Sequence, residues 1–86
     1  MKRIVEDSEA TGLDALLGEK VILLCANYFY TGELVGVNET CVQIKDASIV
    51  YETGEWTATS YKDAQKLGIE PFFVRTDSIE SFGKSK

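Results

Sequence analysis

The fold of this chain is decided by the stretch Lys20–Ala47, which reads KVILLCANYFYTGELVGVNETCVQIKDA. Its first part, Lys20–Ala26, is continuously apolar after the lysine, as expected of a strand that is buried on both faces. A second extended run, Tyr28–Val37, follows a turn at Ala26-Asn27, because asparagine tolerates the positive φ that a tight hairpin demands. A third run begins at Cys41, where apolar and polar residues alternate. The stretch therefore predicts three consecutive antiparallel strands with no helix between them.

Two features of this stretch predict a strongly bent sheet. Gly32 and Gly36 lie inside the second strand, and interior glycines mark sharp bends or places where two backbones approach closely. In the third strand, the apolar residues occupy even-numbered positions up to Ile44 and odd-numbered positions afterwards. A bend or bulge near Asp46-Ala47 would produce this change, because it moves the following side chains to the other face.

We expect one domain over residues 1–86 with four parts: a short N-terminal helix (8–18), the three-stranded meander (20–53), a long inserted loop (54–70) and two last strands (71–82). The inserted loop is predicted to contain a helical turn over Lys62–Leu67, and its Trp56 and Tyr61 are candidates for packing or for binding. The last strands are predicted at Phe72–Arg75 and Ser78–Phe82, with Pro71 at a position where a missing N–H is tolerated. The leucines of the helix are expected to cover an open end of the sheet, and binding to a partner is their alternative role.

A helix followed by five short, strongly bent antiparallel strands predicts a mainly β fold, a small open barrel of the SH3-like kind. An open barrel keeps two sheet edges, here the last two strands, which are apolar enough to pair with another subunit. Head-to-tail pairing of these edges would close a ring of identical subunits. The candidate interface residues are Phe72, Val74, Ile79 and Phe82.

The length, the absence of long apolar runs and the N-terminal residues indicate what class of protein to expect. At 86 residues, a single core is only marginally sufficient, so support from a partner subunit is expected. No apolar run approaches the length of a membrane span. The N-terminus, where Met1-Lys2-Arg3 precedes an acidic stretch, does not resemble a signal peptide, and a cytoplasmic protein is therefore expected.

The composition argues against several kinds of site. The net charge is −5, from 14 acidic and 9 basic residues, which disfavours a nonspecific nucleic-acid binder but leaves room for a small local basic site. There is no histidine, and Cys25 and Cys41 lie in predicted strands without a metal-ligand spacing. We therefore expect no metal, no cofactor and no enzymatic activity.

Three stretches, taken in order, resemble the Sm-like (LSm and Hfq) family of RNA-binding ring proteins. Residues 13–21, LDALLGEKV, are similar to the helix and first-strand entry of that family. Residues 31–38, TGELVGVN, followed by residues 41–47, CVQIKDA, are similar to its first motif. Residues 73–79, FVRTDSI, are similar to its second motif, whose usual core is an apolar pair, Arg-Gly, a polar residue and Ile.

The resemblance implies an Sm-like fold and a homo- or hetero-oligomeric ring, usually of six or seven subunits, in which the fourth strand of one subunit pairs with the fifth strand of the next. It also implies that single-stranded RNA binds around the pore. The loop after the second strand would contact the base from one side, and an arginine, here Arg75, would pack on it from the other. Carried onto this sequence, the implied RNA-binding residues are Asn38, Thr40, Cys41, Arg75, Thr76 and Asp77.

The sequence departs from the family's pattern at some of these positions. Thr40 or Cys41 stands where an aromatic, His or Met side chain commonly stacks on the base, and stacking contributes about 1–3 kcal/mol per base. Thr76 replaces the glycine of the Arg-Gly pair, where a β-branched residue would fit poorly if the turn required positive φ. Two hypotheses follow. The leading one is a ring that binds single-stranded RNA, and its alternative is a structural or protein-interaction ring that has lost the RNA site.

Overall fold

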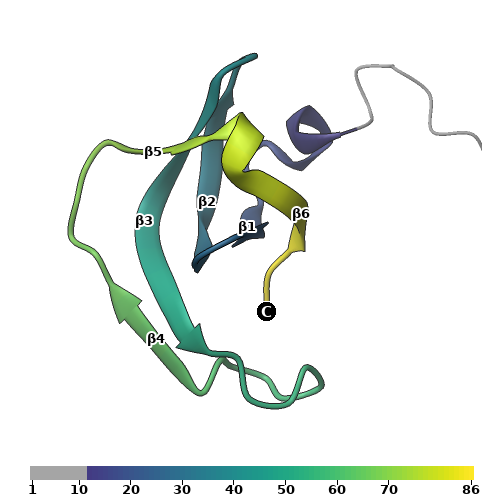
Figure 1. The fold of residues 1–86 in the computed structure, drawn as a ribbon, viewed down its shortest axis with the longest axis vertical. Coiled ribbons are helices and arrows are strands. Elements are labelled where there is room, and N and C mark those ends of the chain that lie inside the picture. Colours follow the sequence, from purple (N-terminus) through teal and green to yellow (C-terminus); the bar gives the residue numbers. More distant parts are fainter. Residues whose placement is uncertain (1–11) are drawn as a thin grey trace, which may run out of the picture.

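The computed structural model describes residues 12–86, which consist mainly of β-strands (Figure 1). Six strands form one antiparallel sheet, and two short 3-10 helices, η1 and η2, accompany it. In chain order the elements are η1 (Leu13–Leu16), β1 (Lys20–Cys25), β2 (Phe29–Val37), β3 (Cys41–Glu52), β4 (Asp63–Lys66), β5 (Phe72–Arg75), η2 (Thr76–Ser78) and β6 (Ile79–Lys84). No helix in the described part of the chain is long and apolar enough to cross a membrane.

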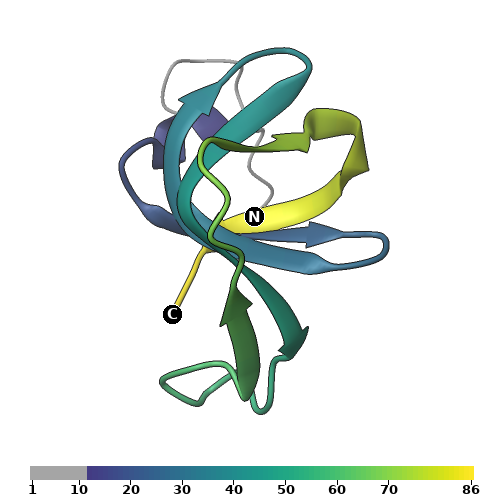
Figure 2. The same ribbon diagram turned by 90° about the vertical axis from the view of Figure 1, so that its left-hand side faces the viewer.

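The long strand β3 organises the sheet. One of its edges pairs with β2, and β1 and β6 continue the sheet beyond β2. Its other edge is shared, because β5 pairs with the first part of β3, Cys41–Ile44, and β4 pairs with the last part, Ser48–Glu52. The two views of the ribbon show the sheet curling so that β5 and β6 come round towards each other (Figures 1 and 2). These two strands do not pair, and the sheet therefore stays open between them.

A bulge in β3 gives the sheet its bend, as the sequence predicts. β2 pairs Thr31 with Ser48 and Glu33 with Lys45, so β3 contains one more residue than β2 between these two pairs. Asp46 lies within this interval with φ of 54°, and it is the one non-glycine residue with positive φ in the described part of the chain. The bulge moves the following side chains to the other face, which explains the change in parity of the apolar positions.

Gly32 is required because the backbones of β2 and β3 approach closely beside this bulge. A Cβ atom at Gly32 would lie 2.8 Å from the carbonyl oxygen of Lys45 and 3.2 Å from the Cβ of Ile44. Gly36 differs, because a Cβ atom there would lie at an ordinary distance of 3.6 Å from the Cβ of Gln43. Of the two glycines that the sequence marks in β2, only Gly32 is therefore at a place of close backbone approach.

The core lies inside the curl and draws on four strands. Its buried cluster comprises Val21, Leu23, Cys25, Leu34, Val42, Ile44, Ala47 and Val74. Partly buried apolar side chains from other elements pack against this cluster, namely Leu13, Leu16, Tyr30, Leu67, Phe72 and Ile79. The residues Val21, Ile22 and Leu23 are all buried, which confirms that β1 is covered on both faces.

The segment between β3 and β5 differs from the prediction. The prediction of a helical turn over Lys62–Leu67 is wrong, because Asp63–Lys66 forms β4 and pairs with the last part of β3. All side chains of β4 are exposed, so this strand has no alternation of buried and exposed residues from which it could be predicted. The free backbone groups at the edge of β3 provide hydrogen-bonding partners, and this tertiary contact overrides a weak local preference for helix. The sheet consequently has six strands where the sequence predicts five.

The two ends of the described chain also differ from the prediction. Of the helix expected over residues 8–18, residues 12–18 contain only the 3-10 helix η1, and residues 8–11 lie outside the described part. The last strand is predicted over Ser78–Phe82, but β6 continues to Lys84, which pairs with Val21. The N–H of Ser85 then donates to the carbonyl of Lys20 over 2.8 Å, which holds this end of the chain against β1.

We predict that Gly32→Ala destabilises the protein by about 2 kcal/mol or more, because the added methyl group has to displace the backbone of β3. Gly36→Ala is the matched control on the same strand, and we expect it to change the free energy of unfolding by no more than about 1 kcal/mol. Urea denaturation followed by circular dichroism measures both values. Equal effects of the two substitutions would contradict the close approach at Gly32.

Candidate functional site

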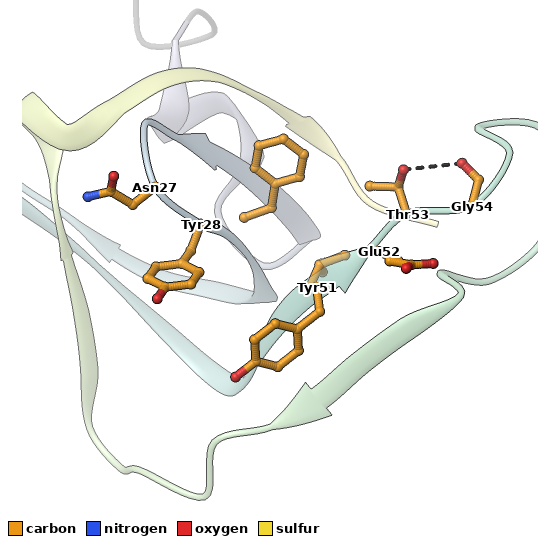
Figure 3. A pocket seen from close by; sticks show the side chains of 8 residues that line it. Asn27, Tyr28, Tyr51, Glu52, Thr53 and Gly54 are labelled. Carbon is orange, nitrogen blue, oxygen red and sulfur yellow. Dashed lines mark hydrogen bonds between the residues drawn. The ribbon is translucent and has the colours of Figure 1, made fainter.

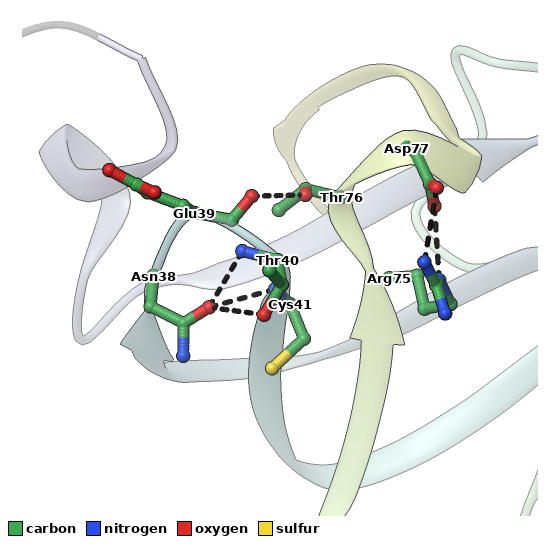
Figure 4. A network of polar contacts seen from close by, with 7 residues as sticks. All are labelled: Asn38, Glu39, Thr40, Cys41, Arg75, Thr76 and Asp77. Carbon is green, nitrogen blue, oxygen red and sulfur yellow. Dashed lines mark hydrogen bonds and ion pairs between the residues drawn. The ribbon is translucent and has the colours of Figure 1, made fainter.

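The loop between β2 and β3 lies beside η2, and the six residues implied as RNA contacts gather there (Figure 4). The pairing of β3 with β5 causes this, because it sets Cys41 opposite Arg75. Thr76 then joins the two segments through two hydrogen bonds. Its N–H donates to the carbonyl of Thr40 over 2.9 Å, and its hydroxyl donates to the carbonyl of Glu39 over 2.8 Å. We refer to residues 38–41 and 75–77 as the two-loop site.

Asn38 shapes the first loop of this site. Its Oδ1 accepts hydrogen bonds from the N–H of Thr40 at 2.8 Å, the N–H of Cys41 at 2.9 Å and the hydroxyl of Thr40 at 3.0 Å. Such an Asx turn fixes the loop locally. Within the described residues, the amide nitrogen of Asn38 has no hydrogen-bond partner. The carbonyl end of this side chain is therefore structural, and the NH₂ end faces outward as a donor (Figure 4).

Thr76 fits its position without strain. It begins η2, and it is not among the residues with positive φ. The turn thus has no need for the glycine that the family pattern has at this position. The hydroxyl of Thr76 also makes the bond to Glu39 that a glycine could not make.

Arg75 and Asp77 form a bidentate pair at the surface. The Nε of Arg75 lies 3.2 Å from one carboxylate oxygen of Asp77, and Nη2 lies 3.3 Å from the other. The hydrogen bond from Asp77, together with its charge, raises the pKa of Arg75, so the guanidinium keeps its charge at any ordinary pH. Because both side chains are exposed, water competes with this pair, and a phosphate can replace the carboxylate as the partner of Arg75.

A hollow of about 580 Å³ adjoins the two-loop site, between β5, β6 and the turn after β1. Arg75 and Asp77 line it together with three aromatic residues, of which Tyr30 is half-buried and Phe73 and Tyr28 are exposed. Phe73 is 52% exposed and points to the same side of β5 as Arg75, because side chains two residues apart in a strand share a face. Neither of the two exposed aromatic residues is among the site residues expected from the sequence. Phe73 could have been identified from the sequence, because its spacing of two residues from Arg75 in a predicted strand places both side chains on one face.

A second hollow, of about 490 Å³, lies at the turn after β1 and the end of β3 (Figure 3). Tyr28 and Tyr51 are its exposed aromatic residues, and Tyr28 also lines the hollow beside Arg75. An aromatic surface thus continues from the two-loop site to Tyr51. The acidic residue here, Glu52, forms an ion pair with Lys62 at 3.3 Å.

The two cysteines differ in their surroundings. Cys25 is buried at the hollow beside Arg75, and burial, followed by the charge of Glu80, raises the pKa of its thiol. Cys41 is half-buried at the start of β3. A raised pKa leaves less of the reactive thiolate, so Cys25 is a poor nucleophile. Within residues 12–86, no group of His, Cys, Asp and Glu side chains is arranged to hold a metal ion.

The predicted interface residues occupy different environments. Val74 is 6% exposed and belongs to the core of the subunit, so its side chain is not available to a partner. Phe72 and Ile79 are half-buried and pack against the core. Phe82 is 43% exposed. A partner could therefore use the side chain of Phe82 and the unpaired backbone edges of β5 and β6, and an interface there stays a prediction.

No protein-family model matches the chain, and no curated protein or solved structure matches it either. What the site can do therefore has to be argued from its own residues.

We predict that Asn38→Ala lowers the free energy of unfolding by about 1 kcal/mol, because the loop loses the acceptor of three hydrogen bonds. Asn38→Asp keeps an acceptor oxygen in the same place and serves as the matched control, with a stability close to that of the original protein. Urea denaturation measures both. A loss as large in Asn38→Asp as in Asn38→Ala would show that the acceptor oxygen is not what holds the loop.

Proposed function

We propose that this chain is a non-catalytic, Sm-like protein that forms a ring and binds single-stranded RNA at the two-loop site. The observation that carries the proposal is the pair of hydrogen bonds from Thr76 to the loop after β2. These bonds group an amide donor, a hydroxyl and a guanidinium on one exposed surface. The resemblance to the Sm-like family assigns RNA contacts to these same residues.

The arrangement of the strands supports the Sm-like part of the proposal. The sheet is open between β5 and β6, the two strands whose free edges are expected to pair with neighbouring subunits. In such a ring, the hollow beside Arg75 would lie at each junction between subunits. RNA that follows the ring would then meet one Arg75 in every subunit.

Phe73 and Tyr28 can replace the stacking residue that the loop lacks. Thr40 has no ring, but the two aromatic side chains share a hollow with Arg75 and are about half exposed. A base placed there would stack on an aromatic face, with Arg75 beside it. The NH₂ group of Asn38 remains for contacts with base edges, which is how single-stranded RNA is read. The hydroxyl of Thr40 donates to Asn38 and can still accept a hydrogen bond from a base.

A structural or protein-interaction ring is the second candidate, and the exposed apolar side chains favour it. They comprise Leu17, Tyr28, Val35, Val37, Tyr51, Trp56, Ile69, Phe73 and Phe82. Exposed aromatic residues are typical of protein interfaces as well as of nucleic-acid sites. The net charge of −5 also repels a polyanion.

We predict that the protein binds labelled oligo-U or oligo-A in fluorescence anisotropy at low salt, and that Phe73→Ala and Arg75→Ala each weaken binding about fivefold or more. The first loses a stacking surface, and the second loses the cation of the site. Val35→Ala and Lys84→Ala remove an exposed apolar side chain and an exposed cation elsewhere, and both should bind like the original protein. Circular dichroism confirms that each variant is folded.

Two results would contradict the RNA proposal. If the control variants weaken binding as much as the site variants, the binding is a nonspecific surface effect. If an oligomeric, folded protein does not bind either oligonucleotide even at low salt, the two-loop site is not an RNA site, and the second candidate function takes its place.

We predict that the protein is oligomeric and that Phe82→Lys dissociates it into folded monomers, because a charge at the edge strand β6 opposes pairing with another subunit. Val35→Lys is the matched control, since Val35 is 42% exposed on the interior strand β2. Light scattering coupled to size-exclusion chromatography measures both masses. An oligomer that survives Phe82→Lys, or one that Val35→Lys dissociates instead, would place the interface elsewhere.

A further inference from the structure

A third hollow, of about 460 Å³, lies between the inserted segment and the strands β2 and β3. Basic residues are concentrated in it. Four of the nine Lys and Arg residues of the chain line this hollow, against two of its fourteen Asp and Glu residues. The four are Lys20, Lys62, Lys66 and Lys86, and the two are Asp46 and Asp63. A chain with a net charge of −5 thus has a locally basic hollow, which we call the lysine hollow.

Among the residues that the structure describes, three of these lysines form no ion pair with a carboxylate. Residues 12–86 contain two ion pairs, Lys62 with Glu52 at 3.3 Å and Arg75 with Asp77. Within this part of the chain, Lys20, Lys66 and Lys86 therefore lack an acidic partner at ion-pair distance. An unpaired cation beside a hollow is available to an anionic ligand.

Lys86 is held in place at the rim. Its ammonium group donates to the carbonyl of Glu55 over 2.9 Å and lies over two aromatic rings, 5.7 Å from the centre of Trp56 and 4.8 Å from that of Tyr61. Contacts of this kind orient a lysine without neutralising its charge. The sequence leaves binding and packing open for Trp56 and Tyr61. In the structure, Tyr61 lines this charged hollow, and Trp56 contacts it only through Lys86.

Hydroxyl groups make up much of the remaining lining. They belong to Thr31, Ser48, Thr59, Ser60 and Tyr61. Two of them are already tied to Ser85, since the hydroxyl of Thr31 donates to it over 3.1 Å and that of Tyr61 is 2.8 Å away. Within residues 12–86, the hydroxyls of Ser48, Thr59 and Ser60 make no hydrogen bond, so they remain as further donors.

We propose that the lysine hollow is a nucleotide-binding site. Ammonium groups and hydroxyl donors around one space match the oxygens of a phosphate, to which lysine binds as a point charge. Asp46 and Asp63 disfavour a bare anion but suit the hydroxyl groups of a ribose, because carboxylates accept hydrogen bonds. The volume lies within the range of small-molecule sites. A nucleoside phosphate combines both kinds of group.

This site is separate from the two-loop site. β3 begins at the two-loop site, whereas the lysine hollow lies beside its later residues, Asp46 and Ser48, and beside β4. Figure 1 shows the short helix that follows β5 near one end of β3 and β4 beside its other end. Ligand binding in the lysine hollow therefore requires neither ring formation nor Arg75.

The test is isothermal titration calorimetry with AMP and ATP, with adenosine and inorganic phosphate for comparison, at low salt. We expect saturable binding of both nucleotides and at least about tenfold weaker binding of adenosine, which lacks the phosphate. Lys20→Gln/Lys66→Gln should weaken AMP binding about tenfold or more. Lys45→Gln, which changes an exposed lysine of β3 outside the hollow, should leave the AMP affinity within about twofold.

The fluorescence of Trp56, the single tryptophan of the chain, gives a second readout. A phosphate that draws Lys86 away from the ring should change its emission, and adenosine should not. An absence of saturable AMP binding, or an adenosine affinity equal to that of AMP, would overturn the proposal. So would a loss in Lys45→Gln as large as that in the double variant. Inorganic phosphate that binds as tightly as AMP would overturn the nucleotide assignment.

A further titration with oligo-A tests whether the lysine hollow binds a free nucleotide or a nucleic-acid strand. If oligo-A displaces bound AMP, and still does so in the Arg75→Ala variant, the result would support a phosphate site in the lysine hollow that a nucleic-acid strand also reaches. If oligo-A binds and AMP does not, the nucleotide assignment is wrong. Loss of oligo-A binding in Arg75→Ala with AMP binding unchanged would instead support two separate sites.

Discussion

The bend of β3 at Asp46 is the constraint on which the rest of the structure depends. One strand of twelve residues crosses the whole sheet, and a straight strand of that length could not keep apolar residues against a single small core. The bulge reverses which side chains face inward, so Ile44 and Ala47 are both buried. A non-glycine residue with positive φ carries a cost of about 1 kcal/mol or more. The N–H of Asp46 is satisfied there by the carboxylate of Glu70 over 3.0 Å.

The same bend divides β3 into two halves with different partners, and each half carries a site. Before the bulge, β5 pairs with β3 and brings Arg75 to the loop that follows β2. After the bulge, β4 pairs with β3 and brings the lysines of the inserted segment to Lys20 and Lys86. β2 pairs with residues of β3 on both sides of the bulge, and Gly32 permits the close approach of the two backbones beside it. The division of the molecule into two candidate binding regions is therefore a consequence of backbone geometry.

The sequence predicts patterns within a strand and the antiparallel pairing of the consecutive strands β1, β2 and β3, but it does not predict the pairing of β3 with the inserted segment. The alternation of apolar residues in the meander and the change of parity at Asp46 follow from local periodicity, and β5 was predicted at the residues that form it. β4 was missed because its side chains are exposed and only its backbone is engaged.

The two candidate sites also differ in how far the sequence predicts them. A motif resemblance gathered the residues of the two-loop site, but the bonds of Thr76 depend on the register between β3 and β5. The lysine hollow has no local signal at all, since its four lysines are spread from position 20 to position 86.

The charges around Arg75 determine what kind of ligand the two-loop site can prefer. Asp77 already forms an ion pair with the guanidinium of Arg75, and Glu39 adds a further negative charge in the neighbouring loop. A phosphate backbone gains little from such a site, because each contact with Arg75 requires the release of Asp77. Stacking on Phe73 and Tyr28 and hydrogen bonds from Asn38 have no such competitor. Binding there would consequently depend more on bases than on phosphates, and it would fall less steeply with salt than binding to a basic groove.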